Sequence, residues 1–298
     1  MKKIEVLLIA TLSLCMLASC SQDAKEEQDD TILVPVTVHV NGFSITQDNI
    51  PTNRAAAIES VSNVKAITLA FFASDGSQAY KHTQFKNDAS TFTTYGEFSI
   101  SLPYGSYTMV VLGYGQGSAA QEITLTGPTA ATFGEGRVRD TFSATQAVDI
   151  TNSNAVELSA TLDRIVSALA VRSTDNRPAD VTSMRFTFSK GGKSFNPTSG
   201  LATENAGFVD LMEYTTAAGT TTNTGTYLFL AIDEQTMNVT IETLNADGAV
   251  LFSKTVNNVP FKRDRQTILT GPLYSNSGVS VGSFMVNNEW ITAYNMDL

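Results

Sequence analysis

Residues 34–42 read VPVTVHVNG, and this stretch indicates the fold class. Valine stands at every second position from residue 34 to residue 40, with Thr37 and His39 in between. Successive side chains of a β-strand point to opposite faces, so the pattern predicts a strand with one apolar and one polar face. Asn41-Gly42, a dipeptide typical of tight turns, is expected to end that strand.

Short apolar runs between Gly, Asn and Asp continue along the chain and predict an all-β protein. Residues 98–112 are expected to form a hairpin around Pro103-Tyr104-Gly105. Residues 162–171 also fit one face of a helix, but their β-branched side chains and their surroundings favour a strand. With a boundary at residues 152–154, the pattern predicts two β-sandwich domains, residues 32–153 and 154–298.

The N-terminus has the pattern of a bacterial lipoprotein signal. Two lysines precede an apolar run over residues 6–18, and the run ends in LASC with Cys20 last. The run is shorter than the roughly 20 residues that a helix needs to span a bilayer, so residues 1–19 are expected to be a signal peptide. The lipobox pattern implies cleavage between Ser19 and Cys20 and acylation of Cys20, palmitate included; the alternative is an ordinary secretory peptide.

Residues 20–31 are expected to form a tether. Residues 21–30, SQDAKEEQDD, are too polar to bury a core, which predicts a solvated segment. The segment also resembles the acidic export signal of surface lipoproteins in the Bacteroidetes, although an ordinary linker would look the same. The only cysteines are Cys15 and Cys20, so the folded part has no thiol for a disulfide or a metal site.

The sequence offers little for catalysis. Its histidines, His39 and His82, lie in predicted strand or polar segments, and no GxSxG elbow, HExxH zinc motif or calcium loop is present. Gly113–Gly117 is glycine-rich, but a strand is expected after it where a phosphate-binding loop would need a helix. We therefore expect that the protein is not an enzyme and that it binds neither a metal ion nor a cofactor. The net charge of −10 argues against nucleic acid as a partner.

The C-terminus alternates apolar and polar residues up to the last position. Its apolar positions are Phe284, Val286, Trp290, Tyr294, Met296 and Leu298. An amphipathic strand that ends a chain can add to a neighbouring subunit's sheet through backbone hydrogen bonds. It can equally close its own C-terminal sandwich.

Three segments resemble the fimbrillin superfamily of Bacteroidales. They are LPYGSY at residues 102–107, ATLDRIV at 160–166 and VPFKRDRQT at 259–267, the last followed by TGPLY. The resemblance implies two transthyretin-like β-sandwich domains and pili assembled by strand exchange. In polymerising members an arginine-directed protease removes the first strand, and a C-terminal strand of the next subunit replaces it. The candidate cut here is Arg54-Ala55, in an expected polar loop.

Together these patterns predict a structural subunit of a fimbrium, as anchor, accessory, tip or shaft, that supports cell adhesion. Its expected location is the outer membrane surface, with other fimbrial subunits, the membrane and a host or bacterial surface ligand as partners. The alternative function is a surface lipoprotein that binds glycans. That reading predicts exposed aromatic rings, whereas most phenylalanines and tyrosines here alternate within predicted strands.

Overall fold

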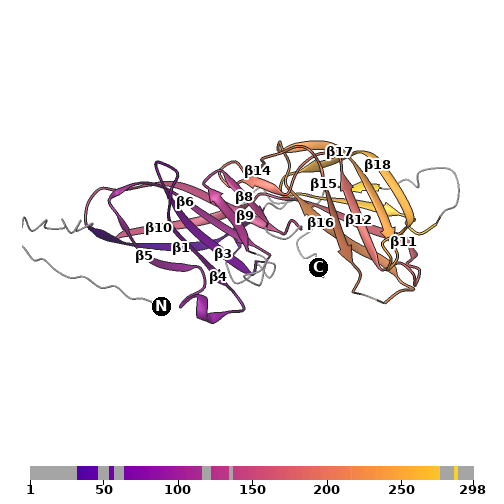
Figure 1. The fold of residues 1–298 in the computed structure, drawn as a ribbon, viewed down its shortest axis with the longest axis horizontal. Coiled ribbons are helices and arrows are strands. Elements are labelled where there is room, and N and C mark those ends of the chain that lie inside the picture. Colours follow the sequence, from indigo (N-terminus) through magenta and orange to yellow (C-terminus); the bar gives the residue numbers. More distant parts are fainter. Residues whose placement is uncertain are drawn as a thin grey trace, which may run out of the picture. The chain divides into compact units, whose positions relative to one another are not determined.

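The computed structural model describes residues 32–45, 54–56, 64–115, 122–133, 137–215, 217–275 and 285–287. In these residues the chain consists of β-strands and turns, with one short 3-10 helix, η1 (Ala89–Thr91) (Figure 1). The described part of the chain has no helix that is long and apolar enough to cross a membrane. The prediction of an all-β sandwich protein is confirmed.

The N-terminal strands form one eight-stranded sheet. In order of pairing its strands are β2 (Arg54–Ala56), β1 (Leu33–Ile45), β10 (Val156–Arg164), β9 (Thr141–Ile150), β6 (Gly105–Tyr114), β3 (Ala66–Ala73) and β4 (Gln78–Phe85), with β5 (Glu97–Pro103) also on β1. β10 and β9 pair only where Asp163 and Arg164 face Ser143 and Phe142. The sheet folds over at this point, so that β5, β1 and β10 form one layer and β9, β6, β3 and β4 the other.

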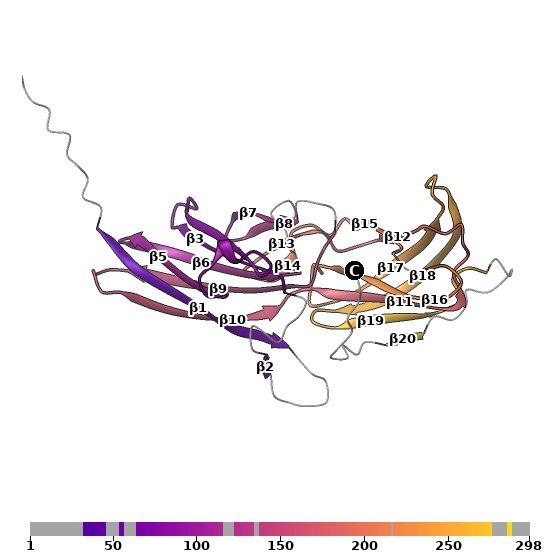
Figure 2. The ribbon, with the colours of Figure 1, turned by 90° about the horizontal axis from the view of Figure 1, so that it is seen from below.

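Three four-stranded sheets make up the rest. The first contains β14 (Leu201–Ala202), β13 (Ser194–Asn196), β8 (Ala130–Phe133) and β7 (Ile123–Gly127). The second contains β16 (Thr221–Leu228), β11 (Ser167–Asn176), β19 (Gln266–Gly271) and β20 (Met285–Asn287). The third contains β15 (Phe208–Glu213), β12 (Ser183–Phe188), β17 (Glu234–Leu244) and β18 (Val250–Lys262). The last two sheets lie face to face as a sandwich (Figure 2).

The valines of β1 form one wall of the first core. Val34, Val36, Val38 and Val40 are at most 6% exposed, as their alternation predicts. They pack against the inner face of β3 and β6, in a cluster that includes Ile67, Leu69, Phe71, Met109 and Val111. Each valine buried in this way stabilises the fold by roughly 1.5–3 kcal/mol.

The opposite face of β3 and β6 is buried as well. Ala70, Phe72, Val110 and Leu112 belong to a second core with residues of β7 and β8. This core also contains Phe195 and Phe229, whose rings stack with centroids 4.3 Å apart. Residues from both halves of the sequence therefore share one core, and the described residues from Ile32 onward form a single compact unit. A third core fills the second sandwich.

Two local expectations were wrong. β5 and β6 do not form a hairpin, because β5 pairs with β1 while β6 pairs with β3 and β9. Residues 103–105 thus carry the chain from one layer of the first sandwich to the other. Asn41-Gly42 is not a turn: β1 continues to Ile45, and a shift in its pairing with β10 between Val40 and Gly42 accommodates the extra residue.

The strand assignment at residues 162–171 is confirmed, since β10 and β11 cover most of this range. The two-domain division at residue 153 stays a prediction. That position falls in the turn between β9 and β10, which both belong to the eight-stranded sheet. In addition, β13 pairs with β8 from the expected N-terminal half. The first sheet therefore extends to Arg164.

Candidate functional site

β1 is enclosed by its neighbours. Residues 33–39 pair antiparallel with β5, and residues 36–44 pair in parallel with β10 (Figure 1). Phe43 is fully buried, with its ring centroid 4.8 Å from that of Phe142 in an edge-to-face arrangement. Gly113 of β6 leaves room for this ring, because a Cβ there would lie 2.6 Å from a ring carbon of Phe43. β1 is therefore held along its length by β5 and β10, two strands that are distant from it in the sequence.

The candidate processing position lies in β2. Arg54–Ala56 pairs antiparallel with Phe43–Ile45, at the end of β1. The loop expected around Arg54 is instead a three-residue strand in its described part. β2 ends the pairing order of its sheet, so no described strand covers its other edge. The Arg54–Ala55 peptide bond is thus held to the fold from one side.

Only part of the C-terminal pattern is described. β20 pairs antiparallel with β19, and Val286 stands opposite Leu269. This pairing matches the alternative in which the C-terminal segment begins by closing its own sandwich. Ser19, Cys20, Phe284, Trp290, Tyr294, Met296 and Leu298 lie outside the described residues.

A buried ion network joins two of the segments that carry the family resemblance. The Arg164 guanidinium donates to both carboxylate oxygens of Asp140, from Nε at 2.9 Å and Nη2 at 3.1 Å. It also donates from Nη1 to Asp264 at 3.2 Å, so the ATLDRIV and VPFKRDRQT segments meet here. The network adds Arg265, whose Nη1 lies 3.5 Å from Asp264.

The network sets the ionisation of its central arginine. Burial works against the charge of Arg164, but the carboxylates of Asp140 and Asp264 outweigh it and raise the pKa of Arg164 above its usual value. Asp140 was not singled out from the sequence. It lies 24 residues from Arg164, and nothing in its local pattern distinguishes it from a surface carboxylate.

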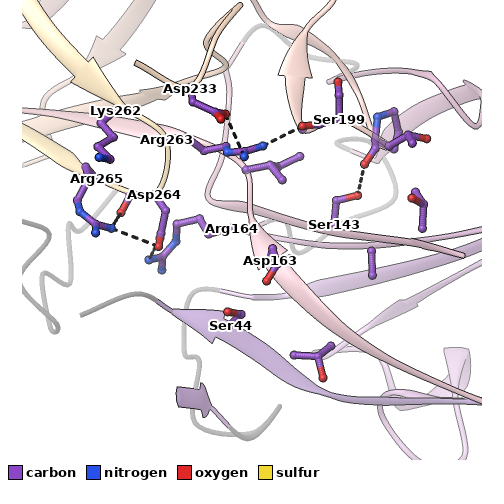
Figure 3. A pocket seen from close by; sticks show the side chains of 17 residues that line it. Ser44, Ser143, Asp163, Arg164, Ser199, Asp233, Lys262, Arg263, Asp264 and Arg265 are labelled. Carbon is purple, nitrogen blue, oxygen red and sulfur yellow. Dashed lines mark hydrogen bonds and ion pairs between the residues drawn. The ribbon is translucent and has the colours of Figure 1, made fainter. Parts of the chain in front are cut away.

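A polar cavity of about 670 Å³ lies beside this network (Figure 3). Hydroxyl side chains from β1, β9 and β10 line one part of it, namely Ser44, Ser143, Thr145 and Thr161. The last residue of β18, Lys262, and the turn after it, with Arg263 and Arg265, supply the basic part of the lining. Arg263 is fixed by Asp233 at 3.0 Å and by the Ser199 carbonyl at 2.8 Å. The described lining residues therefore present hydrogen-bonding groups of both charges, and none of them has an aromatic ring.

Among the described residues, no hydrogen bond joins either histidine to a serine or threonine hydroxyl. His39 lies between Glu157 at 3.2 Å and Glu97 at 3.5 Å on the polar face of β1. The Nε2 atom of His82 is 2.7 Å from the Thr91 carbonyl. Within the described ranges, no group of three or more His, Cys, Asp or Glu side chains could hold a metal ion.

A protein-family model matches residues 34–291, nearly all of the part described above. It defines a family of unknown function (DUF6562). The chain belongs to this family. No curated protein matches the chain.

Solved structures that match the chain are distant from it. A proposed adhesin from Bacteroides ovatus has 10% identity and a TM-score of 0.49, over 86% of this chain and 96% of that one. A proposed polysaccharide-binding protein from Bacteroides thetaiotaomicron has 12% identity and a TM-score of 0.46, over 85% and 96%. The fimbrial anchor protein Mfa2 from Porphyromonas gingivalis has 12% identity and a TM-score of 0.45, over 88% and 98%.

Proposed function

We propose that this DUF6562 protein is a surface subunit of a fimbrium that is lipidated at Cys20 and assembles by exchange of β1. The observation that supports the proposal is the way in which β1 is packed and paired in the first sandwich. Its apolar side chains fill the first core, while its backbone is paired on both edges. Removing β1 would leave a groove between β5 and β10, open to backbone pairing and lined by apolar side chains.

The alternating C-terminal segment has the pattern that such a groove would accept. An incoming strand must place apolar side chains at every second position, as β1 does with its valines. The segment from Phe284 to Leu298 has apolar residues at most even positions. In this proposal the segment of one subunit, β20 included, leaves β19 and occupies the groove of the next subunit.

The order of segments along the chain links the anchor to assembly. Cys20 and the tether of residues 20–31 lead directly into β1, and β2 with Arg54 follows it. Cleavage after Arg54 would detach the lipidated end, and loss of that end with β1 would open the groove. An uncleaved molecule would keep both β1 and its lipid, as a membrane anchor requires. Processing would therefore decide between anchor and polymerising subunit.

Treatment of the chain from Ser21 onward with an arginine-specific protease tests this proposal. We expect a new N-terminus at Ala55 and a ladder of oligomers that resists mild denaturant. Arg54→Lys is the matched control, because it keeps the charge and removes the cleavage site. Monomers before and after cleavage, also with candidate partner subunits present, would contradict strand exchange.

The polar cavity favours a second candidate function, the binding of glycans. Its volume of about 670 Å³ is in the range of ligand sites, and its hydroxyl and charged groups can bond sugar hydroxyls. The described lining residues would bind a sugar through hydrogen bonds. A glycan array tests this function, and Thr161→Val, which removes one lining hydroxyl, should weaken any signal if the cavity is the site.

A further inference from the structure

β15 is an edge strand that exposes aliphatic side chains. Val209 is 46% exposed and Leu211 53%, which makes them two of the few large apolar residues on the described surface. β15 pairs with β12 on one side, and no described strand pairs with its other side. Figure 2 shows β15 and β12 side by side in the same layer. The strand therefore combines an open backbone edge with an apolar outer face.

The backbone groups on the open edge can be identified from the register. The Tyr214 amide donates to the Thr182 carbonyl at 3.0 Å, so this pair is hydrogen-bonded across the two strands. Hydrogen-bonded positions alternate along an antiparallel pair. The N–H and C=O groups of Val209, Leu211 and Glu213 consequently point away from β12.

This edge has only one of the inward-pointing charges that protect edge strands, Asp210, and that charge is paired with Arg137. Proteins block such edges with lysines, prolines and bulges. β18, at the opposite edge of the same sheet, has Pro260, Lys254 and two shifts in its register with β17. β15 has no lysine or proline and pairs with β12 without a shift.

We infer that β15 pairs with β15 of a second copy of this chain. An antiparallel pair centred on Leu211 would place Leu211 opposite Leu211 and Val209 opposite Glu213, so that all three open residues are bonded. The two Leu211 side chains and the flanking valines would then form one apolar strip on the outer face. A contact of this kind is isologous, because each copy contributes the same surface.

Charge complementarity supports the antiparallel arrangement. Glu213 lies at the end of β15 and has no ion pair among the described residues. The Lys193 ammonium lies 5.7 Å from the centroid of the Phe208 ring, at the start of the strand. Antiparallel pairing brings Glu213 of each copy towards the start of β15 in the other copy, where Lys193 lies.

This contact is separate from strand exchange. It uses neither Arg54, β1 nor the C-terminal segment, so it would form between uncleaved chains and would associate subunits side by side. Because one strand edge is small compared with a stable interface, we expect weak association that is detectable at about 0.1–1 mM.

Sedimentation of the uncleaved chain from Ser21 onward tests the inference. We expect a monomer–dimer equilibrium that Leu211→Lys weakens by about tenfold or more, because it puts like charges opposite each other. Val250→Lys is the matched control, since Val250 is 44% exposed on the protected edge strand β18 and should leave the equilibrium unchanged. A wild-type chain that stays monomeric at about 1 mM overturns the inference, and so does equal weakening by both variants.

Disulfide cross-linking tests the register. The folded part of the chain has no cysteine, so one introduced cysteine reports one contact. Directly opposed residues of a hydrogen-bonded pair lie within disulfide distance, at about 5.5 Å between Cα atoms. Leu211→Cys should therefore form a covalent dimer on oxidation, whereas Val209→Cys should not. Equal cross-linking of the two variants would overturn the proposed pairing.

Discussion

Arg164 is a buried cation whose charge is balanced by carboxylates from two distant parts of the chain. Its side chain is 5% exposed and that of Asp140 is 2% exposed. Replacing Arg164 by Met should lower the free energy of unfolding by about 3–5 kcal/mol, because Asp140 would stay buried without its partner. Chemical denaturation followed by circular dichroism measures the loss.

Arg185 provides the control for this substitution. It bonds Glu242 at 2.7 Å, but their side chains are 34% and 20% exposed, so water screens the pair. Arg185→Met should cost about 0–1 kcal/mol. If the free energy of unfolding fell equally in the two variants, the buried network would contribute no more to stability than an exposed ion pair.

Buried tyrosines should make the fold sensitive to alkali. Burial raises the pKa of Tyr114 to about 12 and also raises the pKa values of Tyr95, Tyr214 and Tyr227. An unfolded tyrosine ionises near pH 10, so above that pH the folded chain binds more protons than the unfolded chain. Stability should therefore be intact below about pH 10 and fall as the pH rises towards 12.

An alkaline titration checks this prediction. Tyrosinate absorbance from the buried rings should appear together with the loss of circular dichroism, since these rings ionise when the fold opens. Tyr114 alone should contribute about 2–3 kcal/mol of the loss by pH 12, from its shift of about two pKa units. Complete tyrosine ionisation at about pH 11 with the fold intact would contradict the prediction.

In β1 the alternation of side chains predicts that substitutions at adjacent positions change the stability of the fold by very different amounts. Val38 is fully buried, whereas Thr37 lies on the polar face and is partly exposed. Val38→Asn should cost about 2–4 kcal/mol, because it buries an amide without a partner. Thr37→Asn should change stability by no more than about 0.5 kcal/mol. Denaturant midpoints of the two variants measure the contrast, and similar values would place β1 outside the core.

For the whole protein, Cys20 is expected to determine where the chain resides. Cys20→Ser should release the protein from the membrane fraction, because no acyl chain could be attached. Cys15→Ser is the control: it changes the other cysteine, inside the predicted signal peptide, and should leave the protein membrane-bound. Cell fractionation and mass spectrometry of the mature N-terminus measure both outcomes. Retention of the Cys20→Ser protein in the membrane would contradict lipid anchoring.

Pairing between distant strands could not be predicted from local patterns. The turn residues at 103–105 predicted a hairpin, but β5 pairs with β1, whose paired residues lie 58 to 70 residues earlier in the chain. The Arg164 network also joins distant segments, since Asp140 and Asp264 are separated from Arg164 by 24 and 100 residues. Neither feature has a local periodic signal.

The order of residues was enough to predict that the chain is all-β and which face of β1 is buried. Side-chain direction in a strand alternates with period two, so a few consecutive residues are enough to define both. The neighbours of β1, the balance of charge at Arg164 and the open edge of β15 follow from the three-dimensional fold and not from local patterns. These depend on which distant segments come together, because hydrogen-bonded backbones accept many partners and the packing of the whole chain selects among them.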